Sequence, residues 1–457
     1  MPTPLEPDQH TRRDLLAGVV SFLDDFYSHM ADLPVSGVEL DDARTRALSC
    51  PPPEEGRSLD DALGLVALAN QSGSLHPSGG HMAYIPNGGL FTGALGAFLA
   101  AGLNRYTGVA GAAPGLAVLE DTVVRWLGEL FELPEGSSGG VLLSGGSMAN
   151  LTAIVAARTR RLPEDFLTGT IYVSSHVHHS VTKAARLAGF PARAVRTVPT
   201  DVDLRMDVDE LMAMVDEDRH QGRRPFLLVG SAGTTDTGTV DPLADLAAVA
   251  HEQGLWLHID AAYGGFFQLT DRGRKRLVGI GAGDSVTLDP HKGLSIPFGV
   301  GALLARDRTS LLEAHDATGA YLQDHHTDTS DFSSLGPELT RPFRGMHVWL
   351  PLQVHGVGAF RTELDEALDL AEHAYERLRL EAWVEQIWRP DLSIVAFRAF
   401  DDEAARRALE ATNASGEVYL SSTSIRGRYT LRLAILNRRT ELAHVDAAID
   451  LLSDHLG

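Results

Sequence analysis

The sequence contains very little cysteine and very little lysine. Its one cysteine, Cys50, allows no disulfide within a single chain and fits a reducing, cytoplasmic compartment. Lysine occurs only as Lys183, Lys275 and Lys292, against 36 arginines. Arginine can be neither deprotonated nor converted to an imine in a protein. A lysine kept in such a chain is therefore a candidate for chemistry that needs a free amine.

Long apolar runs and excess positive charge are also missing. No apolar run reaches the roughly 20 residues that a membrane-spanning helix needs. Acidic residues outnumber basic ones by 61 to 39, so the formal net charge is −22 at pH 7, which repels nucleic acid and anionic membranes. The sequence predicts neither kind of partner. Its 457 residues, 44% of them apolar, predict a globular protein with one large and one smaller domain.

Short apolar strands alternate with helices between residues 86 and 345. This pattern predicts a mostly parallel sheet that helices cover on both faces, and such sheets bind ligands at the carboxyl ends of their strands. Strands are expected at 141–143, 170–173, 226–229, 255–259 and 285–288, and helices at 150–160, 181–187 and 242–251.

Two regions of different character flank this segment. Residues 11–31 carry apolar side chains at helical spacing, so residues 1–85 are expected to form a helical arm that packs on the chain's own body or on a partner subunit. Residues 346–457 read as a smaller α+β domain. Its strands are expected at 393–400 and 429–436, and its helices at 402–412 and 441–456. The predicted fold class is α/β, with the large domain at residues 86–345.

A carboxylate and an amine close two neighbouring predicted strands. Asp260 ends the strand at 255–259, and Lys292 follows the strand at 285–288. A site for pyridoxal 5′-phosphate (PLP) requires this pair: Lys292 to bond the aldehyde, and Asp260 to keep the pyridine nitrogen protonated so that the ring draws electrons from Cα. The alternative for Asp260 is a structural carboxylate that caps a turn.

A glycine-containing turn is suited to the phosphate of such a cofactor. Residues 144–150 join a predicted strand to a helix, and Gly146 and Ser147 would offer free backbone N–H groups at the helix N-terminus. His291, beside Lys292, could donate a further hydrogen bond to the phosphate.

Other positions at the strand ends could contact the ring. Ala262 is small enough for the ring to lie against the backbone, and Thr234 could bond its edge through the hydroxyl group. One imidazole among His176, His178 and His179 could stack on the ring and face the substrate carboxylate. The alternative is a metal site, but no carboxylate or cysteine at ligand spacing accompanies these histidines, and no metal is predicted.

Motifs along nearly the whole chain occur in a recognisable order. They are His76-Pro77, Tyr84 with Pro86, Ala113-Pro114, residues 144–150, His178-His179-Ser180-Val181, Gly233-Thr234-Thr235, residues 258–265, Asp289-Pro290-His291-Lys292, Arg344 with Trp349, and Leu431-Arg432-Leu433. In this order the chain resembles the group II PLP-dependent decarboxylases, the family of aromatic amino acid, histidine and glutamate decarboxylases.

The resemblance carries several implications. It implies the PLP-dependent transferase fold type I and a carboxy-lyase that converts an L-amino acid to its amine and carbon dioxide. It selects His178 as the stacking histidine, catalytic together with Lys292 and Asp260. It also implies a homodimer in which the N-terminal segment wraps the other subunit and the loop at residues 104–114 helps to line the neighbouring active site.

The substrate pocket and the proton donor are less clearly indicated. Tyr84, Pro86 and Tyr106 are expected to line the pocket and favour an aromatic or apolar side chain, although Arg105 would suit an acidic one. Amine-forming relatives carry a loop tyrosine that protonates Cα, and loop length places Phe332 there. A phenyl ring donates no proton, and in aldehyde-forming relatives this change accompanies oxidative deamination by oxygen. Other candidate donors are Tyr321, His325 and His326.

Two further functions remain as alternatives. One is another PLP-dependent carbon–carbon lyase that acts on a phosphorylated amino alcohol, for which the sequence offers no second basic phosphate pocket. The other is a PLP-binding protein without turnover, which the presence of Lys292, Asp260 and His178 together disfavours.

Overall fold

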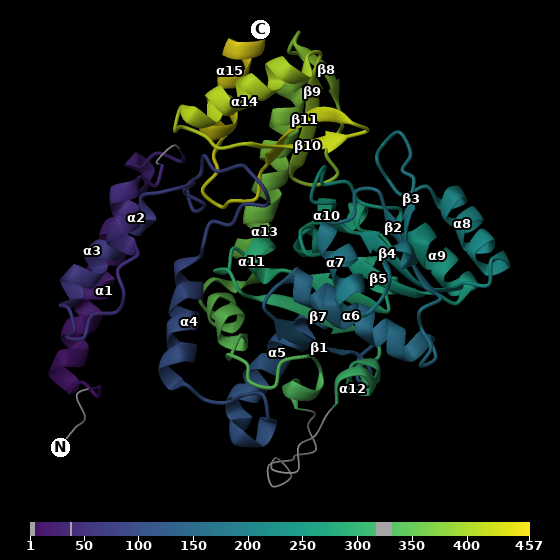
Figure 1. The fold of residues 1–457 in the computed structure, drawn as a ribbon, viewed down its shortest axis with the longest axis horizontal. Coiled ribbons are helices and arrows are strands. Elements are labelled where there is room, and N and C mark those ends of the chain that lie inside the picture. The colour runs from purple at the N-terminus through teal and green to yellow at the C-terminus, as the bar shows by residue number, and fades with distance from the viewer. Residues whose placement is uncertain (1–4, 37–38, 317–330) are drawn as a thin grey trace.

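A computed structural model shows a helical N-terminal arm, a large α/β region and a smaller α+β region (Figure 1). It describes residues 5–36, 39–316 and 331–457. No helix within these ranges is both long and apolar enough to cross a bilayer. The predicted α/β fold with a helical N-terminal region is confirmed.

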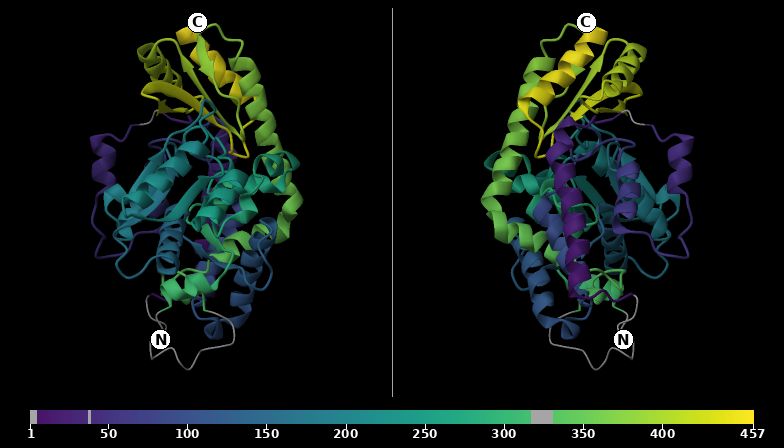
Figure 2. Two further views of the ribbon diagram at one scale, coloured as in Figure 1. Left: turned by 90° about the vertical axis from the view of Figure 1, so that its right-hand side faces the viewer. Right: turned by 90° about the vertical axis from the view of Figure 1, so that its left-hand side faces the viewer.

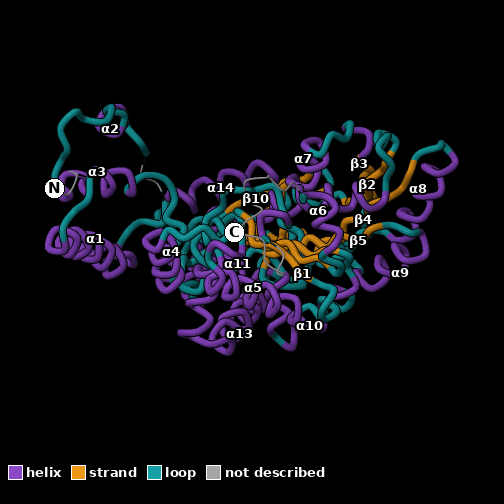
Figure 3. The backbone as a smooth tube through the Cα atoms, turned by 90° about the horizontal axis from the view of Figure 1, so that it is seen from below, coloured by secondary structure: helices purple, strands orange, loops and turns teal. Residues whose placement is uncertain are grey.

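The arm consists of α1 (Gln9–His29), α2 (Asp42–Leu48) and α3 (Leu59–Asn70). Gly18 lets α1 approach α3 closely, since a Cβ at this position would lie 2.7 Å from Cδ2 of Leu59. Figure 3 shows the three helices set to one side of the body. No residue of α1 or α3 is buried within the single chain, so the apolar stripe of α1 faces outward.

The large sheet has the strand order β1-β7-β6-β5-β4-β2-β3. Neighbours from β6 to β3 pair in parallel, whereas β7 is antiparallel to both β1 and β6. Six strands therefore end at one edge. The bounds are β1 (Gly139–Leu143), β2 (Gly169–Ser174), β3 (Val195–Val198), β4 (Arg224–Ser231), β5 (Trp256–Asp260), β6 (Ser285–Leu288) and β7 (Gly301–Ala305).

Helices cover both faces of this sheet (Figure 3). Because side chains alternate along a strand, Leu227 and Val229 of β4 pack with residues of α6 and α7, while Leu228 packs with residues of α8 and α9. The helices are α4 (Phe91–Leu103), α5 (Pro114–Leu130), α6 (Gly146–Arg161), α7 (His179–Leu187), α8 (Val208–His220), α9 (Leu243–Gln253), α10 (Asp271–Arg276), α11 (Pro290–Gly293) and α12 (Thr309–His315).

Helix α13 (Gly345–Leu378) runs from the large sheet to the small one, as Figure 2 shows. Gly356, at φ 71°, breaks its helical geometry, a conformation that favours glycine. The small sheet has the order β10-β11-β9-β8, and α13 contacts both β8 and β9. Its elements are β8 (Val384–Ile387), β9 (Ile394–Ala399), α14 (Asp402–Ala414), β10 (Ser421–Ile425), β11 (Arg428–Ala434) and α15 (Leu442–Leu456).

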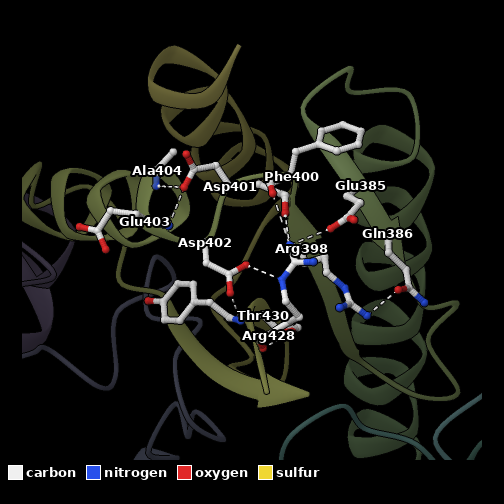
Figure 4. Close-up of polar contacts among 12 residues, drawn as sticks. Glu385, Gln386, Arg398, Phe400, Asp401, Asp402, Glu403, Ala404, Arg428 and Thr430 are labelled. Carbon is white, nitrogen blue, oxygen red and sulfur yellow. Dashed lines mark hydrogen bonds and ion pairs between the residues drawn. The ribbon is translucent and has the colours of Figure 1, made fainter. Parts of the chain in front are cut away.

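Polar contacts fasten the small region internally and to the large sheet. Arg428 bonds both Asp402 and Glu385, joining three elements of the small region (Figure 4). The hydroxyl of Tyr263, just after β5, lies 2.8 Å from Oγ of Ser393 and accepts a bond from its backbone N–H at 2.9 Å. The end of β5 is thus tied directly to the small region.

Candidate active site

The carboxyl edge of the large sheet holds a cavity of about 260 Å³. Residues following β1, β2, β4, β5 and β6 line it, which is why side chains distant in the sequence meet there. The cavity brings together every residue that the sequence analysis assigned to cofactor binding. These are Gly146, Ser147, His178, Thr234, Asp260, Ala262, His291 and Lys292.

Lys292 lies on the single turn α11, directly after β6. Its Nζ is 2.9 Å from Oδ2 of Asp289, whose side chain is 2% exposed. The other oxygen of Asp289 has no hydrogen-bond partner among the described residues. Only glycine fits at position 293, because a Cβ there would lie 2.7 Å from Cβ of Phe266. This close packing fixes the helix that carries the amine.

Asp260 is the last residue of β5 and is buried. Its Oδ2 accepts a bond from Nδ2 of Asn150 at 2.9 Å, and its Oδ1 accepts one from the backbone N–H of Ala262 at 3.2 Å. The carboxylate therefore has a set orientation and still has free lone pairs for a protonated pyridine nitrogen.

The N-terminus of α6 forms the other end of the cavity. No side chain caps its first turn at Gly146, so free N–H groups are available to a phosphate. A Cβ at Gly146 would lie 3.1 Å from Cβ of Ala262 and 3.0 Å from Oδ2 of Asp289, so a side chain would narrow this cradle. Nδ1 of His291 donates to the carbonyl oxygen of Val300 at 2.7 Å, and burial lowers the pKa of His291.

His178 caps the N-terminus of α7 and lines the cavity. Its Nδ1 lies 2.7 Å from Oγ of Ser180, and burial lowers its pKa despite the opposing effect of the Asp260 carboxylate. The other two histidines, His176 and His179, do not line this cavity. His176 pairs with Asp236 at 3.7 Å, and His179 is exposed, its ring 4.2 Å from that of His178.

These residues fit PLP in their chemistry. The amine of Lys292 and the carboxylate of Asp260 occupy one cavity, and the uncapped helix at Gly146 suits a phosphate. The unpartnered oxygen of buried Asp289 further shows a polar environment that is incomplete without a ligand or water.

A second cavity of about 540 Å³ shares His178, Thr235 and Lys292 with the first. Its wall includes Tyr84 and the buried Arg432. Arg432 donates to the carbonyl oxygens of Tyr84, Thr235 and Asp236 and to Oγ of Ser421, and burial lowers its pKa to about 10.

Sequence reasoning gave no role to Arg432 or Asn150. Arg432 appeared only as a motif match, and Asn150 only as the end of the phosphate turn. Arg432 is a polar residue within an apolar strand, and Asn150 is a polar residue on a buried helix face. This is the one signal by which the sequence could have indicated a role for them. Their partners lie up to 348 residues away and cannot be found from spacing.

The four residues expected in the substrate pocket do not gather at one cavity of the single chain. Tyr84 lines the second cavity, whereas Pro86 is buried outside both cavities and Tyr106 donates to the carbonyl oxygen of Leu339. Phe332 lines neither of these two cavities in the single chain. Its ring packs in the aliphatic cluster beneath β1 and β7, with the guanidinium of Arg341 at 5.3 Å. Burial among aliphatic side chains stabilises the ring in this position. The alternative donors Tyr321, His325 and His326 lie outside the described residues.

Comparisons with known proteins place the chain in a family. The model of the pyridoxal-dependent decarboxylase conserved domain matches residues 72–400. An aromatic-L-amino-acid decarboxylase of Bacillus atrophaeus is 33% identical over 442 residues, covering 94% of this chain and 92% of the relative. The structure of Oryza sativa TDC with PLP and tryptamine aligns with a TM-score of 0.94 and 26% identity, covering 100% of this chain and 99% of that one.

An aldehyde-forming enzyme is similar as well. The structure of Rhodiola rosea 4-hydroxyphenylacetaldehyde synthase aligns with a TM-score of 0.92 and 25% identity, covering 99% of both chains. The fold is thus common to proteins named for different products. The chain belongs to the pyridoxal-dependent decarboxylases, lyases that remove a carboxyl group from an amino acid with PLP as cofactor.

Proposed function

We propose that the protein removes the α-carboxylate of an aromatic L-amino acid and releases the amine and carbon dioxide. One observation carries the proposal: the cavity that holds Lys292 and Asp260 shares three lining residues with a second chamber, which Tyr84 also lines. The ring of Tyr84 lies 6.3 Å from the rings of both His81 and Tyr419. Relatives named for tyrosine and aromatic amino acids support the substrate class.

When bound, PLP supplies an electron sink for the bond that breaks between Cα and the carboxylate. Asp260 would face the pyridine nitrogen and keep the sink positive. Lys292 would hold the cofactor through its amine, whose Nζ lies 2.9 Å from Oδ2 of Asp289.

His178 and Arg432 organise the substrate side of the site. The backbone N–H of Ser180 donates to Nδ1 of His178, so the neutral imidazole carries its proton on Nε2, free to donate to a substrate carboxylate. Arg432 uses four of its five N–H donors on protein oxygens. Its main role is to hold Tyr84 against β11 and the loop after β4, which shapes the chamber.

The protein acts as a homodimer in the cytoplasm. Leu15, Leu16, Val19 and Val20 of α1 are 39–59% exposed in the single chain, although their spacing is that of a buried helix face. A second copy would cover this stripe and bring residues 104–114 and Tyr106 toward the neighbouring site. The single cysteine supports a reducing compartment.

The aldehyde-forming reaction stays as an alternative. It rests on Phe332 as the replacement for the proton donor, and in the single chain the ring of Phe332 lies in the aliphatic cluster. Incubation of the purified holoenzyme with a panel of L-amino acids, with carbon dioxide, amine, aldehyde and peroxide measured together, tests the proposal. Amine equal to carbon dioxide with aromatic substrates is expected. Peroxide and aldehyde equal to carbon dioxide, or turnover of acidic amino acids alone, would contradict it.

A further inference from the structure

A continuous chain of buried hydrogen bonds runs beneath the cofactor cavity. The indole Nε1 of Trp256 is 2.9 Å from Oγ of Ser285, which is 2.8 Å from Nδ1 of His258. Nε2 of His258 is 2.9 Å from Oδ1 of Asn150. Nδ2 of Asn150 then reaches both Oδ2 of Asp260, at 2.9 Å, and Oγ of Ser180, at 3.0 Å.

The direction of every bond in this chain is fixed from its ends. An indole N–H can only donate, and an ionised carboxylate can only accept. Asn150 must therefore turn its NH₂ group toward Asp260 and its oxygen toward His258, so Nε2 of His258 carries the proton and Nδ1 accepts from Ser285. Thr287 adds a second donor to the same Asn150 oxygen at 2.9 Å.

The second branch ends on His178. Oγ of Ser180 accepts from Asn150 and donates to Nδ1 of His178 at 2.7 Å. The backbone N–H of Ser180 points at the same nitrogen at 3.3 Å, which independently excludes a proton there. The two branches start from one amide group and end at two residues that line the cavity, Asp260 at the end of β5 and His178 at the N-terminus of α7.

We propose that Asn150 is a positioning residue: its amide group orients Asp260 toward the pyridine nitrogen of PLP and, through Ser180, holds His178 with its proton on Nε2. The inference rests on the role of Asp260 in the proposed function. Asn150 is 1% exposed and lies on α6, whereas its partners lie on β5, β6 and the start of α7.

The neutral state of His258 belongs to the same arrangement. His258 is fully buried, and burial lowers its pKa to about 4. A second proton would turn Nδ1 into a donor, so the Ser285 hydroxyl could no longer donate to it. The bond directions given above therefore belong to the uncharged imidazole that burial favours.

The test compares two cofactors. Apo-protein is titrated with PLP and with the carbocyclic analogue in which a C–H group replaces the ring nitrogen. The variant Asn150→Asp keeps the volume of the side chain but places a second carboxylate against Asp260, so the two share a proton and Asp260 loses charge. We expect PLP to bind at least about 10-fold more weakly while the affinity for the analogue changes less than about 2-fold.

Three comparison variants keep the result interpretable. Asn150→Ala should show the same selective loss without an added charge. Ser180→Ala cuts only the branch to His178, so its ratio of PLP to analogue affinity should equal that of the wild type. Asp260→Ala reports on the proposed function itself and should lose PLP selectively.

If the Asn150 variants bind both ligands equally weakly, or bind both as tightly as the wild type, the inference is overturned. A selective loss of PLP affinity in Asp260→Ala would still uphold the role of Asp260. If Asp260→Ala itself failed to distinguish the two ligands, the role of Asp260 would fall and this inference with it.

Discussion

Nζ of Lys292 lies 2.9 Å from Oδ2 of Asp289, a carboxylate that is almost entirely buried. The amine is thus held in place by the residue three positions earlier. The same lysine has two roles that can be separated: it compensates a buried charge, and it bonds the cofactor.

Lys292→Arg and Lys292→Ala separate these roles. Neither variant should show a visible cofactor band, and borohydride should fix no pyridoxyl group on either. Unfolding of the apo-proteins in urea should differ, because only the alanine variant leaves Asp289 unpaired. We expect Lys292→Ala to lose about 1–3 kcal/mol relative to Lys292→Arg, less than for a fully buried pair since Lys292 is 19% exposed. A pyridoxyl adduct that persists in either variant would contradict the assignment of Lys292.

The identity of the proton donor predicts a contrast between two aromatic residues. Phe332→Tyr adds a hydroxyl group to the cluster beneath β1 and β7, so it should lower stability by about 1–3 kcal/mol and leave the ratio of amine to aldehyde unchanged. Tyr321→Phe removes an acidic hydroxyl group and should raise the aldehyde and peroxide yields if Tyr321 protonates Cα. Both products are measured by chromatography and a peroxide assay in air. A changed ratio of amine to aldehyde in Phe332→Tyr would show that the residue at position 332 determines the product.

Replacement of Arg432 should weaken substrate binding because Tyr84 loses its fixed position. Arg432→Lys keeps the positive charge but cannot reach four separate oxygens. We expect stability to fall by about 2–4 kcal/mol, and KM to rise more than kcat falls because Tyr84 is no longer held at the chamber. The measurements are urea unfolding and steady-state kinetics with an aromatic substrate. An unchanged KM would show that Tyr84 does not depend on this contact.

His81 predicts a specific loss of stability in acid. It is fully buried, neither ring nitrogen has a partner among the described residues, and burial, helped by the nearby His76, lowers its pKa to about 4 from 6.5. As the pH falls below 6.5, His81 becomes protonated in the unfolded chain but stays neutral in the folded chain. The free energy of unfolding therefore declines until about pH 4. The full difference is about 3 kcal/mol. Comparison of wild type with His81→Leu by urea unfolding at pH 7.5 and 4.5, at one protein concentration, should show a smaller decline in the variant. Parallel declines would refute the assignment.

The arm predicts the assembly state. Leu16 and Val20 are one turn apart on α1 and 44% and 59% exposed. Replacing both with Asp should convert a dimer to monomers in analytical ultracentrifugation, because charge in an apolar interface is costly. Val202→Asp, at a 74% exposed position far from the arm in the sequence, is the matched control and should leave the mass unchanged. Monomeric wild-type protein would rule out the dimer.

Much of this site could be predicted because its parts are local. Asp260 and Lys292 each follow an apolar strand, and the turn before α6 is contained in a few consecutive residues. Strand and helix periodicity also located β1, β2, β4, β5 and β6 to within a few residues. It missed β3 and β7, and it gave no indication that β7 runs against its neighbours.

The amino-acid sequence by itself determined which chemical groups stand at the strand ends, since an apolar run followed by a polar residue is a local signal. Only the tertiary structure decided which groups meet. Asn150 reaches Asp260 across 110 residues and Arg432 reaches Tyr84 across 348, because helix and strand packing sets those distances. The place of Phe332 was decided in the same way: hydrophobic burial of its ring depends on which faces enclose it, and no spacing along the chain records that.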